Sequence, residues 1–237
     1  RPVFDLIMER APRTILLASA GFAVAIPLGM LIGVVSGTTR RPAVNTTFTT
    51  LALVAYAIPT FWLGQILIMS LALWLGWFPT QGVGPLVSRA HGFSWLLERA
   101  RYLALPVLAF AVHEGMRFAR IMRASVADTL SQGYIVTARA KGLSRGQIIR
   151  RHMLRNSSLP LVTTAGYAFG SALGGTVLLE TVFTWPGLGL LMVDSIRVRD
   201  NLTVIGIVIF SAIAVVVMNL VVDILYVLLD PRIRTAR

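Results

Sequence analysis

The sequence predicts an all-α fold, a polytopic bundle of transmembrane helices, on two observations. First, 56% of the 237 residues are hydrophobic and only 14% are charged, and the mean hydropathy is +0.75. One soluble domain of this length could not bury so much apolar surface. Second, several charge-poor stretches exceed the roughly 20 residues that a helix needs to cross the ~30 Å hydrocarbon core with its backbone groups paired internally. Lipid is therefore expected to be part of the solvent.

We expect about five spans, in one transmembrane domain that covers residues 1–237. The first span, 14–35, and the fourth, 157–179, contain no charged residue. The second, 44–75, is longer than a span needs and contains Pro59, so it is either one tilted, kinked helix or a helix with an interfacial turn. The third is 102–121. The fifth, 202–229, has Asp223 as its only charged residue.

The formal net charge of +12 is concentrated at three places. Basic residues follow the first span, fill the polar segment after the third span and end the chain. They are Arg40, Arg41, Arg139, Lys141, Arg145, Arg150, Arg151, Arg155, Arg232, Arg234 and Arg237. The positive-inside rule assigns this side, with the C-terminus, to the cytoplasm. Because the charges bracket apolar spans and do not cover one solvated face, nucleic-acid binding is excluded.

Five spans and a cytoplasmic C-terminus place the N-terminus outside, yet residues 1–13 are neither a signal peptide nor an initiating Met sequence. We therefore expect a segment to be missing upstream. The apolar residues Val3, Phe4, Ile7 and Met8 indicate a short interfacial helix before the first span, with a frayed tail as the alternative.

Catalysis and metal binding have little support in the sequence. There are no cysteines, and His91, His113 and His152 lack the spacing of metal ligands. No string matches the P-loop pattern, so any ATP must be hydrolysed by other chains. An intramembrane enzyme would need a catalytic set at membrane depth, whereas Glu114 and Asp223 are on different spans.

The polar segment between the third and fourth spans, about residues 125–156, predicts a helix-turn-helix that protrudes from the bilayer. Asp128 or Ser131 could cap the first helix, and Gly142 is a natural stop after Lys141. Ser144 is the expected N-cap of a second helix that runs to about residue 154. The helices would offer a surface to a partner, and the alternative is a solvated basic loop that only fixes the topology. A passive channel would not need such a segment.

The string Thr184–Gly189, TWPGLG, predicts a turn on the external side. Proline and two glycines favour the turn, and Trp185 with Phe183 suits an aromatic belt at the membrane interface. An interfacial re-entrant turn explains the string without a functional role.

Three ionisable residues within or near the spans are functional candidates, because charge in hydrocarbon is costly. Glu114 is expected to pair with Arg117 three residues later, near the cytoplasmic interface. Glu180 is expected at the outer interface, and Asp223 is expected to pair with a neighbouring helix or subunit. The small residues Gly166, Gly170, Gly174 and Gly175 indicate close helix packing.

Several strings together resemble one family, the B-type membrane permeases of dipeptide and oligopeptide ABC importers. The strings are TARAKGLSRGQIIRRHMLRN, ETVFTWPGLGLLMVDSI, DILYVLLDPRIR, IPTFWLG and LGWFPTQG. The resemblance spans essentially the whole chain and implies a type I ABC importer permease with six spans per subunit, so that a first span would be missing upstream of this chain. Permeases of ABC importers share a cytoplasmic motif of Glu-Ala-Ala, three variable residues and Gly, with a later Ile-x-Leu-Pro. In this chain only Ala138, Gly142 and Leu154 match that motif outright.

The resemblance also implies sites, partners and a location. A coupling helix would dock on a cytoplasmic ATPase through Ala138, Arg139, Ala140, Lys141, Gly142, Leu143 and Ser144. Trp185, Pro186 and Gly187 would lie near an external gate that faces a binding protein. The implied partners are a C-type permease subunit, two ATP-binding subunits that hold ATP and Mg²⁺, and an extracytoplasmic solute-binding protein. This chain would need no cofactor of its own and catalyse no bond chemistry.

The implied function is ATP-driven import of di- and oligopeptides across the bacterial inner membrane. Permeases of this type that carry nickel, glutathione or murein peptides are the alternatives within the family. A passive channel and an intramembrane enzyme are the alternatives outside it.

Overall fold

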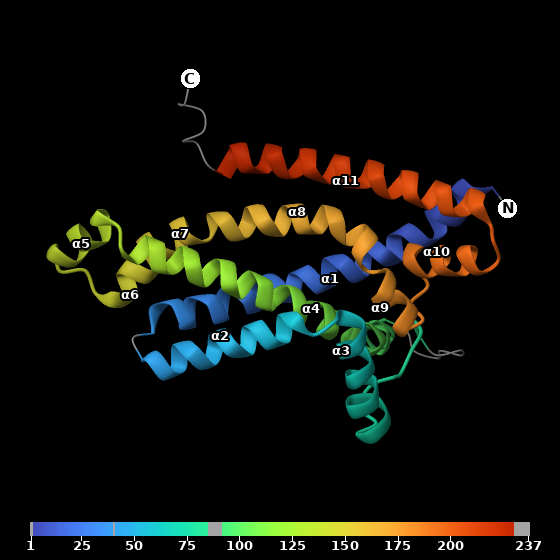
Figure 1. Ribbon diagram of the computed structural model, residues 1–237, viewed down its shortest axis with the longest axis horizontal. Coiled ribbons are helices and arrows are strands. Elements are labelled where there is room, and N and C mark those ends of the chain that lie inside the picture. The colour runs from blue at the N-terminus through green and yellow to red at the C-terminus, as the bar shows by residue number, and fades with distance from the viewer. Residues whose placement is uncertain (1, 40, 85–91, 230–237) are drawn as a thin grey trace. The chain divides into compact units, whose positions relative to one another are not determined.

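A computed structural model describes residues 2–39, 41–84 and 92–229, and every regular element in these ranges is helical (Figure 1). Contacts divide the chain into two compact units. Unit 1 contains residues 1–23, 58–110 and 167–237, and unit 2 contains 24–57 and 111–166. Three long helices contribute residues to both: α1 (Val3–Thr38), α4 (Phe93–Leu130) and α8 (Leu159–Gly175). The expectation of one domain stays a prediction.

The helices follow in this order: α1 Val3–Thr38, α2 Pro42–Ala57, α3 Thr60–Leu67, the π-helix η1 Ile68–Trp74, α4 Phe93–Leu130, α5 Gly133–Ala140, α6 Arg145–Ile148, the π-helix η2 Ile149–Met153, α7 Leu154–Ser157, α8 Leu159–Gly175, α9 Val177–Val182, α10 Leu188–Arg197 and α11 Asn201–Leu229. The expected N-terminal interfacial helix is the start of α1, which continues unbroken into the first apolar stretch.

Among the described residues, two helices are long and apolar enough to cross a membrane, Val3–Thr38 and Asn201–Ile224. The stretches Asn45–Ala57 and Thr60–Trp74 pass the same test together as one bent pair, with the break at Pro59. Helix α8 has only 17 residues, and α4 has Glu114 and Arg117 within its apolar stretch. The count of five spans stays a prediction.

Glycines at a spacing of four bring α1 and α4 into close parallel contact in unit 2. A Cβ atom on Gly29 would lie 2.5 Å from the Cβ of Phe118, and one on Gly33 would lie 2.5 Å from the Cβ of Met122. Gly37 approaches Val126 in the same way. Each step of four residues on α1 thus matches four on α4. The two helices run in the same direction, as expected if one bent span separates them.

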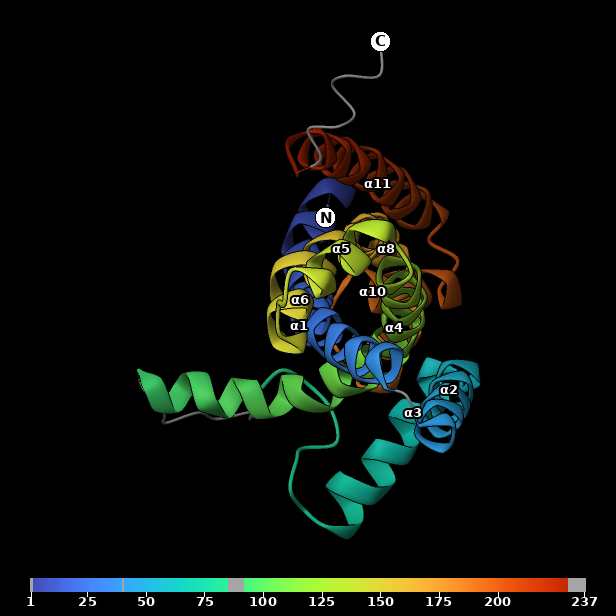
Figure 2. The same cartoon turned by 90° about the vertical axis from the view of Figure 1, so that its left-hand side faces the viewer.

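In unit 1, α11 lies along the start of α1 (Figure 2). Ile7 and Ala11 of α1, Leu188 of α10 and Ile207 of α11 form a buried cluster. The turn before α11 is closed by Asp200, whose carboxylate accepts hydrogen bonds from the Thr203 hydroxyl (2.6 Å) and backbone N–H (3.1 Å). These bonds hold the pKa of Asp200 below its ordinary value.

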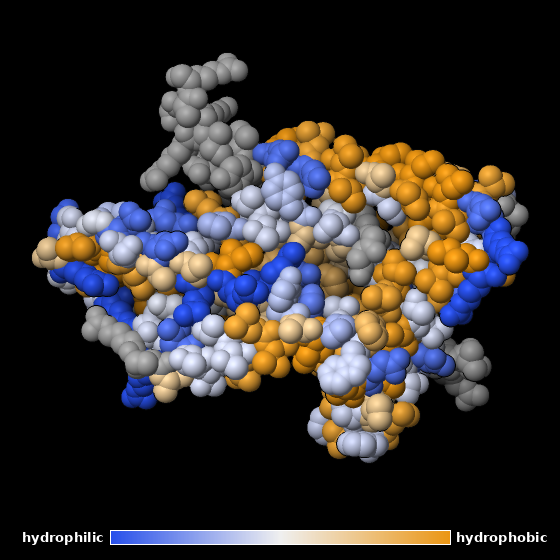
Figure 3. All heavy atoms as spheres, in the orientation of Figure 1, coloured by the Kyte–Doolittle hydropathy of each residue, from blue (hydrophilic) through white to orange (hydrophobic). Residues whose placement is uncertain are grey.

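Helix α8 contacts α11 in the part of unit 1 that follows residue 166. A Cβ on Gly170 would lie 3.1 Å from Asn219 Oδ1, so the expected close packing is found at this glycine. The Tyr167 hydroxyl donates a 2.9 Å hydrogen bond to Asp223 Oδ1, which identifies a partner on a neighbouring helix for that carboxylate. Elsewhere α11 presents apolar side chains to the surface, among them Val216 and Leu220 (Figure 3).

Candidate functional site

The segment 133–157, which we call the basic segment, folds around an apolar interior. Ile135, Ala138 and Ile148 are buried there, and the partly buried Leu130 and Leu143 pack against them. The interior joins α5 to α6 across the turn. The basic segment is therefore a folded helical hairpin.

The turn between α5 and α6 is set by Gly142 and Ser144. Gly142 has φ +79°, a backbone conformation that glycine adopts without a steric penalty. The Ser144 hydroxyl accepts from the Gln147 N–H, and the Gln147 side chain accepts from the Ser144 N–H at 2.8 Å. This capping box fixes the start of α6. Gly142 as the stop after α5 and Ser144 as the N-cap of α6 are thus confirmed. The Ser-x-x-Gln spacing was an available signal for Gln147.

The start of α5 corrects the sequence-based expectation. Neither Asp128 nor Ser131 caps this helix, because α4 continues to Leu130 and the N-cap of α5 is Gln132. The Ser131 hydroxyl instead donates a 2.7 Å hydrogen bond to the Asp128 carbonyl. Short polar side chains often bind nearby backbone in this way, and here they close the end of α4.

The predicted docking residues divide into exposed and buried positions. Arg139, Ala140, Lys141, Gly142 and Ser144 are exposed, and Leu143 is half-buried. Ala138 is buried in the interior of the basic segment. Its small side chain therefore permits α5 to pack within the chain and presents no surface to a partner.

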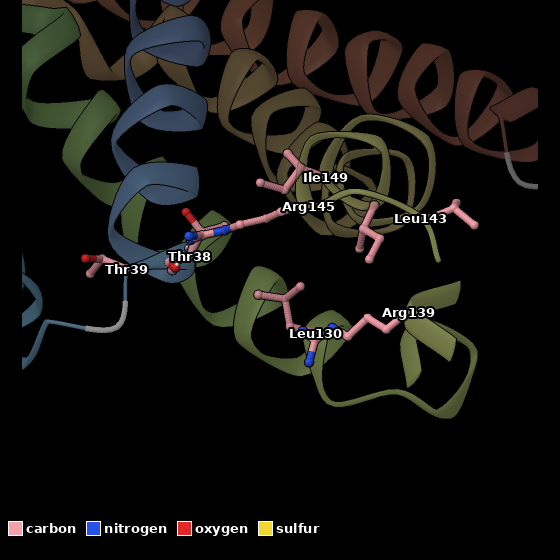
Figure 4. Close-up of a pocket in the computed structure, with 9 residues that line it drawn as sticks. Thr38, Thr39, Leu130, Arg139, Leu143, Arg145 and Ile149 are labelled. Carbon is pink, nitrogen blue, oxygen red and sulfur yellow. Dashed lines mark hydrogen bonds between the residues drawn. The ribbon is translucent and has the colours of Figure 1, made fainter. Parts of the chain in front are cut away.

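A cavity of about 430 Å³ lies where the basic segment meets the end of α1 (Figure 4). Leu130, Leu143 and Ile149 line its apolar part, and Arg139 and Arg145 supply positive charge. Arg145 Nη2 donates a 2.6 Å hydrogen bond to the carbonyl oxygen of Thr38, the last residue of α1. A cation suits this position because carbonyl groups at a helix C-terminus have no helical partner.

The turn at residues 184–187 is held by buried hydrogen bonds in unit 1. Trp185 is only 3% exposed, and its Nε1 donates to the Arg13 carbonyl at 2.9 Å. Phe183 is 2% exposed and packs where a Cβ on Gly64 would stand. The expectation that these aromatics form an interfacial belt is therefore wrong. Gly187 is also buried, and only Pro186 of the three predicted gate residues is partly exposed.

Glu180 is fully buried, and its expected place at the outer interface stays a prediction. Its Oε2 accepts from the backbone N–H groups of Gly189 (2.7 Å) and Leu190 (3.1 Å), at the start of α10. Its Oε1 accepts from the hydroxyls of Thr14 (2.7 Å) and Thr176 (3.1 Å). A carboxylate is favourable at a helix N-terminus. Glu180 thus anchors α10 to α1 and α9 (Figure 1).

Thr14 completes this anchor, a role that no motif in the sequence indicates. Its Oγ1 also accepts a 2.8 Å hydrogen bond from the Leu188 N–H. A Cβ on Gly187 would lie 2.5 Å from both Thr14 Oγ1 and Glu180 Oε2. The glycine is therefore required by close approach. The string 184–189 is held as one rigid turn.

The remaining candidates are located as follows. Glu114 and Arg117 form the predicted ion pair, with Oε2 and Nη2 2.8 Å apart. His152 lies on η2, and His91 lies outside the described residues, as do Arg40, Arg89 and the C-terminal arginines. Within residues 2–39, 41–84 and 92–229, no three His, Cys, Asp or Glu residues come together as a metal site would require.

Comparison with known proteins adds an independent line of observation. Residues 25–235 match the family described as binding-protein-dependent transport system inner membrane component. The oligopeptide transport system permease protein AppB of Bacillus subtilis (strain 168) is 41% identical over 232 residues, which are 98% of this chain and 72% of that protein. The glutathione transport system permease protein GsiC of Escherichia coli O1:K1 / APEC is 36% identical over 234 residues, 99% of this chain and 72% of that protein.

The fold matches that of a known transporter. A chain of the MetNI methionine ABC transporter, solved in inward-facing conformations, aligns with a TM-score of 0.77 at 17% identity. The alignment covers 97% of this chain and 99% of that one. The expected all-α fold of an ABC importer permease is confirmed.

Proposed function

The chain belongs to the family of binding-protein-dependent transport system inner-membrane components, and from that premise we propose that it forms half of the translocation path of an ATP-driven importer of di- and oligopeptides. The resemblance to peptide permeases in the sequence motifs agrees with this membership. One observation carries the choice of substrate: relatives matched over nearly the whole chain are peptide permeases by name. Glutathione, itself a tripeptide, is a second candidate because GsiC is matched over the same length.

In this proposal the exposed tip of the basic segment, residues 139–142 and Ser144, docks on a cytoplasmic ATPase. Two physical features of the segment support this docking. The interior of the segment holds the tip in one conformation, and the exposed Arg139 and Lys141 offer cations to acidic groups of a partner. Closure of two ATPases would then shift the permease between two packed arrangements with opposite access.

The complete assembly would contain a C-type permease, two ATP-binding subunits and an external solute-binding protein. The ATP-binding subunits would hold ATP and Mg²⁺, and this chain would contribute no cofactor and no bond chemistry. The C-terminus would be cytoplasmic. The turn at residues 184–187 would lie near the external gate, where its buried anchors Trp185 and Gly187 would position the backbone and leave the partly exposed Pro186 to face the binding protein.

The test is ATP hydrolysis by the complex in lipid vesicles, with and without peptide-loaded binding protein. Gly142→Asp should abolish the stimulation, because the added side chain protrudes from the tip. Gly82→Asp is a matched control, since Gly82 also has a positive φ (+90°) and open space around its Cβ position. If peptide-loaded binding protein stimulated ATP hydrolysis in the Gly142→Asp complex as strongly as in the Gly82→Asp complex, docking through the tip would be refuted. Stimulation by glutathione-loaded protein only would replace the peptide assignment.

A further inference from the structure

A group of charged and aromatic side chains projects from the middle of α4 in unit 2. We call it the α4 cluster: His113, Glu114, Arg117 and Arg120 of α4 with Tyr56 of α2. The rings of Tyr56 and His113 stack with centroids 5.0 Å apart, and the Arg120 guanidinium lies 5.5 Å from the Tyr56 ring centroid. Glu114 and Arg117 form the 2.8 Å ion pair. Two cations, one carboxylate and an imidazole thus share one site.

The contact with α1 places this cluster deep in the membrane. A Cβ on Gly115 would lie 3.3 Å from the Ala25 carbonyl oxygen, and Gly29 contacts Phe118. Ala25 and Gly29 both belong to the charge-free stretch 14–35. At 1.5 Å per residue, they lie roughly 15 and 9 Å before its inner end at Val35. The Glu114–Arg117 pair is therefore not at the cytoplasmic interface, where the sequence alone had suggested it.

The cluster is not enclosed by this chain. Arg120 is exposed, Arg117 and Glu114 retain 30% and 18% side-chain exposure, and Tyr56 is 37% exposed. Hydrophilic residues cover the middle of α4 in Figure 3. Charged groups exposed at membrane depth almost always face water or a partner, because contact with lipid chains costs several kcal/mol. This face of α4 is therefore unsuited to lipid.

The hydrogen-bonding capacity of the cluster is only partly used within the described residues. His113 Nδ1 and Arg117 Nε are buried and have no hydrogen-bond partner there. The Glu114–Arg117 pair is close, but Glu114 Oε2 and Arg117 Nη2 make no bond of good geometry. Buried polar groups normally have partners. These atoms are themselves buried, so a polar ligand would contact the exposed parts of Arg117, Arg120 and Glu114.

We propose that the α4 cluster lines the translocation path and binds the charged ends of the transported peptide. Arg117 and Arg120 would hold the C-terminal carboxylate, since a guanidinium matches a carboxylate with two parallel hydrogen bonds. Glu114 would accept from the N-terminal ammonium. The proposal rests on the proposed function, since it takes the cargo to be a zwitterionic peptide. It adds residues of this chain that recognise that cargo.

The test uses a single introduced thiol, because the chain has no cysteine. Met116 lies three residues after His113 and four before Arg120, on the same helix face, so Met116→Cys leaves the whole cluster in place. The complete transporter in inside-out vesicles is treated with a charged, membrane-impermeant thiol reagent, and mass spectrometry measures labelling of this subunit. We expect labelling, which alanyl-alanine slows. Val216→Cys on the apolar surface of α11 is the lipid-facing control and should remain unlabelled.

Chemical variants of the peptide identify each contact without the binding protein. The C-terminal amide of alanyl-alanine and its N-acetyl form should both protect about tenfold less well than the free peptide, the effect of one lost charged hydrogen bond. Adding Arg117→Gln together with Arg120→Gln should remove the difference between acid and amide. Adding Glu114→Gln should remove the difference between amine and N-acetyl form. A merely structural role would not produce this selectivity.

Three results would overturn the proposal. Absence of labelling would mean that lipid or a partner subunit covers this face. Labelling without protection would mean that the face is wet but binds no peptide. Equal protection by the peptide and its amide would remove the carboxylate contact. Uptake and ATPase assays of the wild type decide the proposed function separately, so a normal importer with no protection at residue 116 would reject the site alone.

Discussion

Replacing Glu180 with Gln should loosen the start of α10. The buried carboxylate accepts four hydrogen bonds, and two of them come from the backbone N–H groups of Gly189 and Leu190. Glutamine has nearly the same shape and keeps one oxygen for these two groups. The substitution therefore removes the charge and changes the packing very little.

The magnitude follows from the two bonds that hold α10. A hydrogen bond to a charged group contributes about 1.5–3 kcal/mol and a neutral one about 0.5–1.5 kcal/mol. Two such bonds then lose about 2 kcal/mol together, which is roughly a 30-fold change in an opening equilibrium. Glu180→Ala leaves both N–H groups without an acceptor, so its effect on local opening should exceed about 3 kcal/mol.

Hydrogen exchange of the peptide that covers residues 186–197 measures this opening. We expect exchange at Gly189 and Leu190 to accelerate about 30-fold in Glu180→Gln, by the arithmetic above, and further in Glu180→Ala. Thr181→Ala is the matched control, because the Thr181 hydroxyl donates to the Val177 carbonyl of its own helix. That variant should change the free energy of local opening by less than about 0.5 kcal/mol.

Unchanged protection of Gly189 in both Glu180 variants would refute the reasoning. It would mean that other contacts, such as the bond from the Leu188 N–H to Thr14, suffice to hold the helix start. Acceleration in Thr181→Ala as well would show that α9 as a whole had been disturbed. In that case the carboxylate could not be credited with the anchor.

Three further substitutions test the packing and the turns. In a thermal unfolding assay, Gly29→Ala should destabilise the purified subunit by about 1–3 kcal/mol, because its Cβ would lie 2.8 Å from a backbone carbonyl oxygen of α4. Gly146→Ala is the control: it lies in open space on α6 and should be neutral or slightly stabilising in the same assay. Ser144→Ala should cost about 1 kcal/mol at the start of α6, seen as faster amide exchange at Gln147, and unchanged exchange would discount the capping box. Trp185→Phe should reduce the free energy of unfolding by about 1 kcal/mol, and so lower the unfolding temperature, because the indole N–H hydrogen bond is lost. Trp77→Phe, at an exposed position, should leave the unfolding temperature unchanged.

Local features were accessible from the sequence because their causes are local. Gly142 and Ser144 act through backbone conformation and a bond three residues away, and the Glu114–Arg117 pair spans three residues of one helix. Each of these interactions has a recognisable spacing. Helix formation in the apolar stretches follows from the backbone's need for internal hydrogen bonds.

Features that depend on distant residues could not be predicted in this way. The anchoring role of Glu180 could not be predicted because its partner Thr14 is 166 residues away. Trp185 looked like a belt residue, but its indole N–H reaches Arg13, 172 residues away. The four-residue spacing of glycines in α1 was a visible signal for close packing, although the facing helix was not.

The separation of roles within the basic segment bears on how such a surface can change over generations. Ile135, Ala138 and Ile148 keep the hairpin folded, whereas Ala140 and Lys141 are exposed and lie outside that interior. Exposed substitutions usually alter stability by less than about 0.5 kcal/mol. Under the proposed docking, selection can therefore adjust these exposed residues to a diverging partner while the hairpin itself persists. By the same reasoning, a duplicated permease could acquire a new ATPase partner through a few surface mutations.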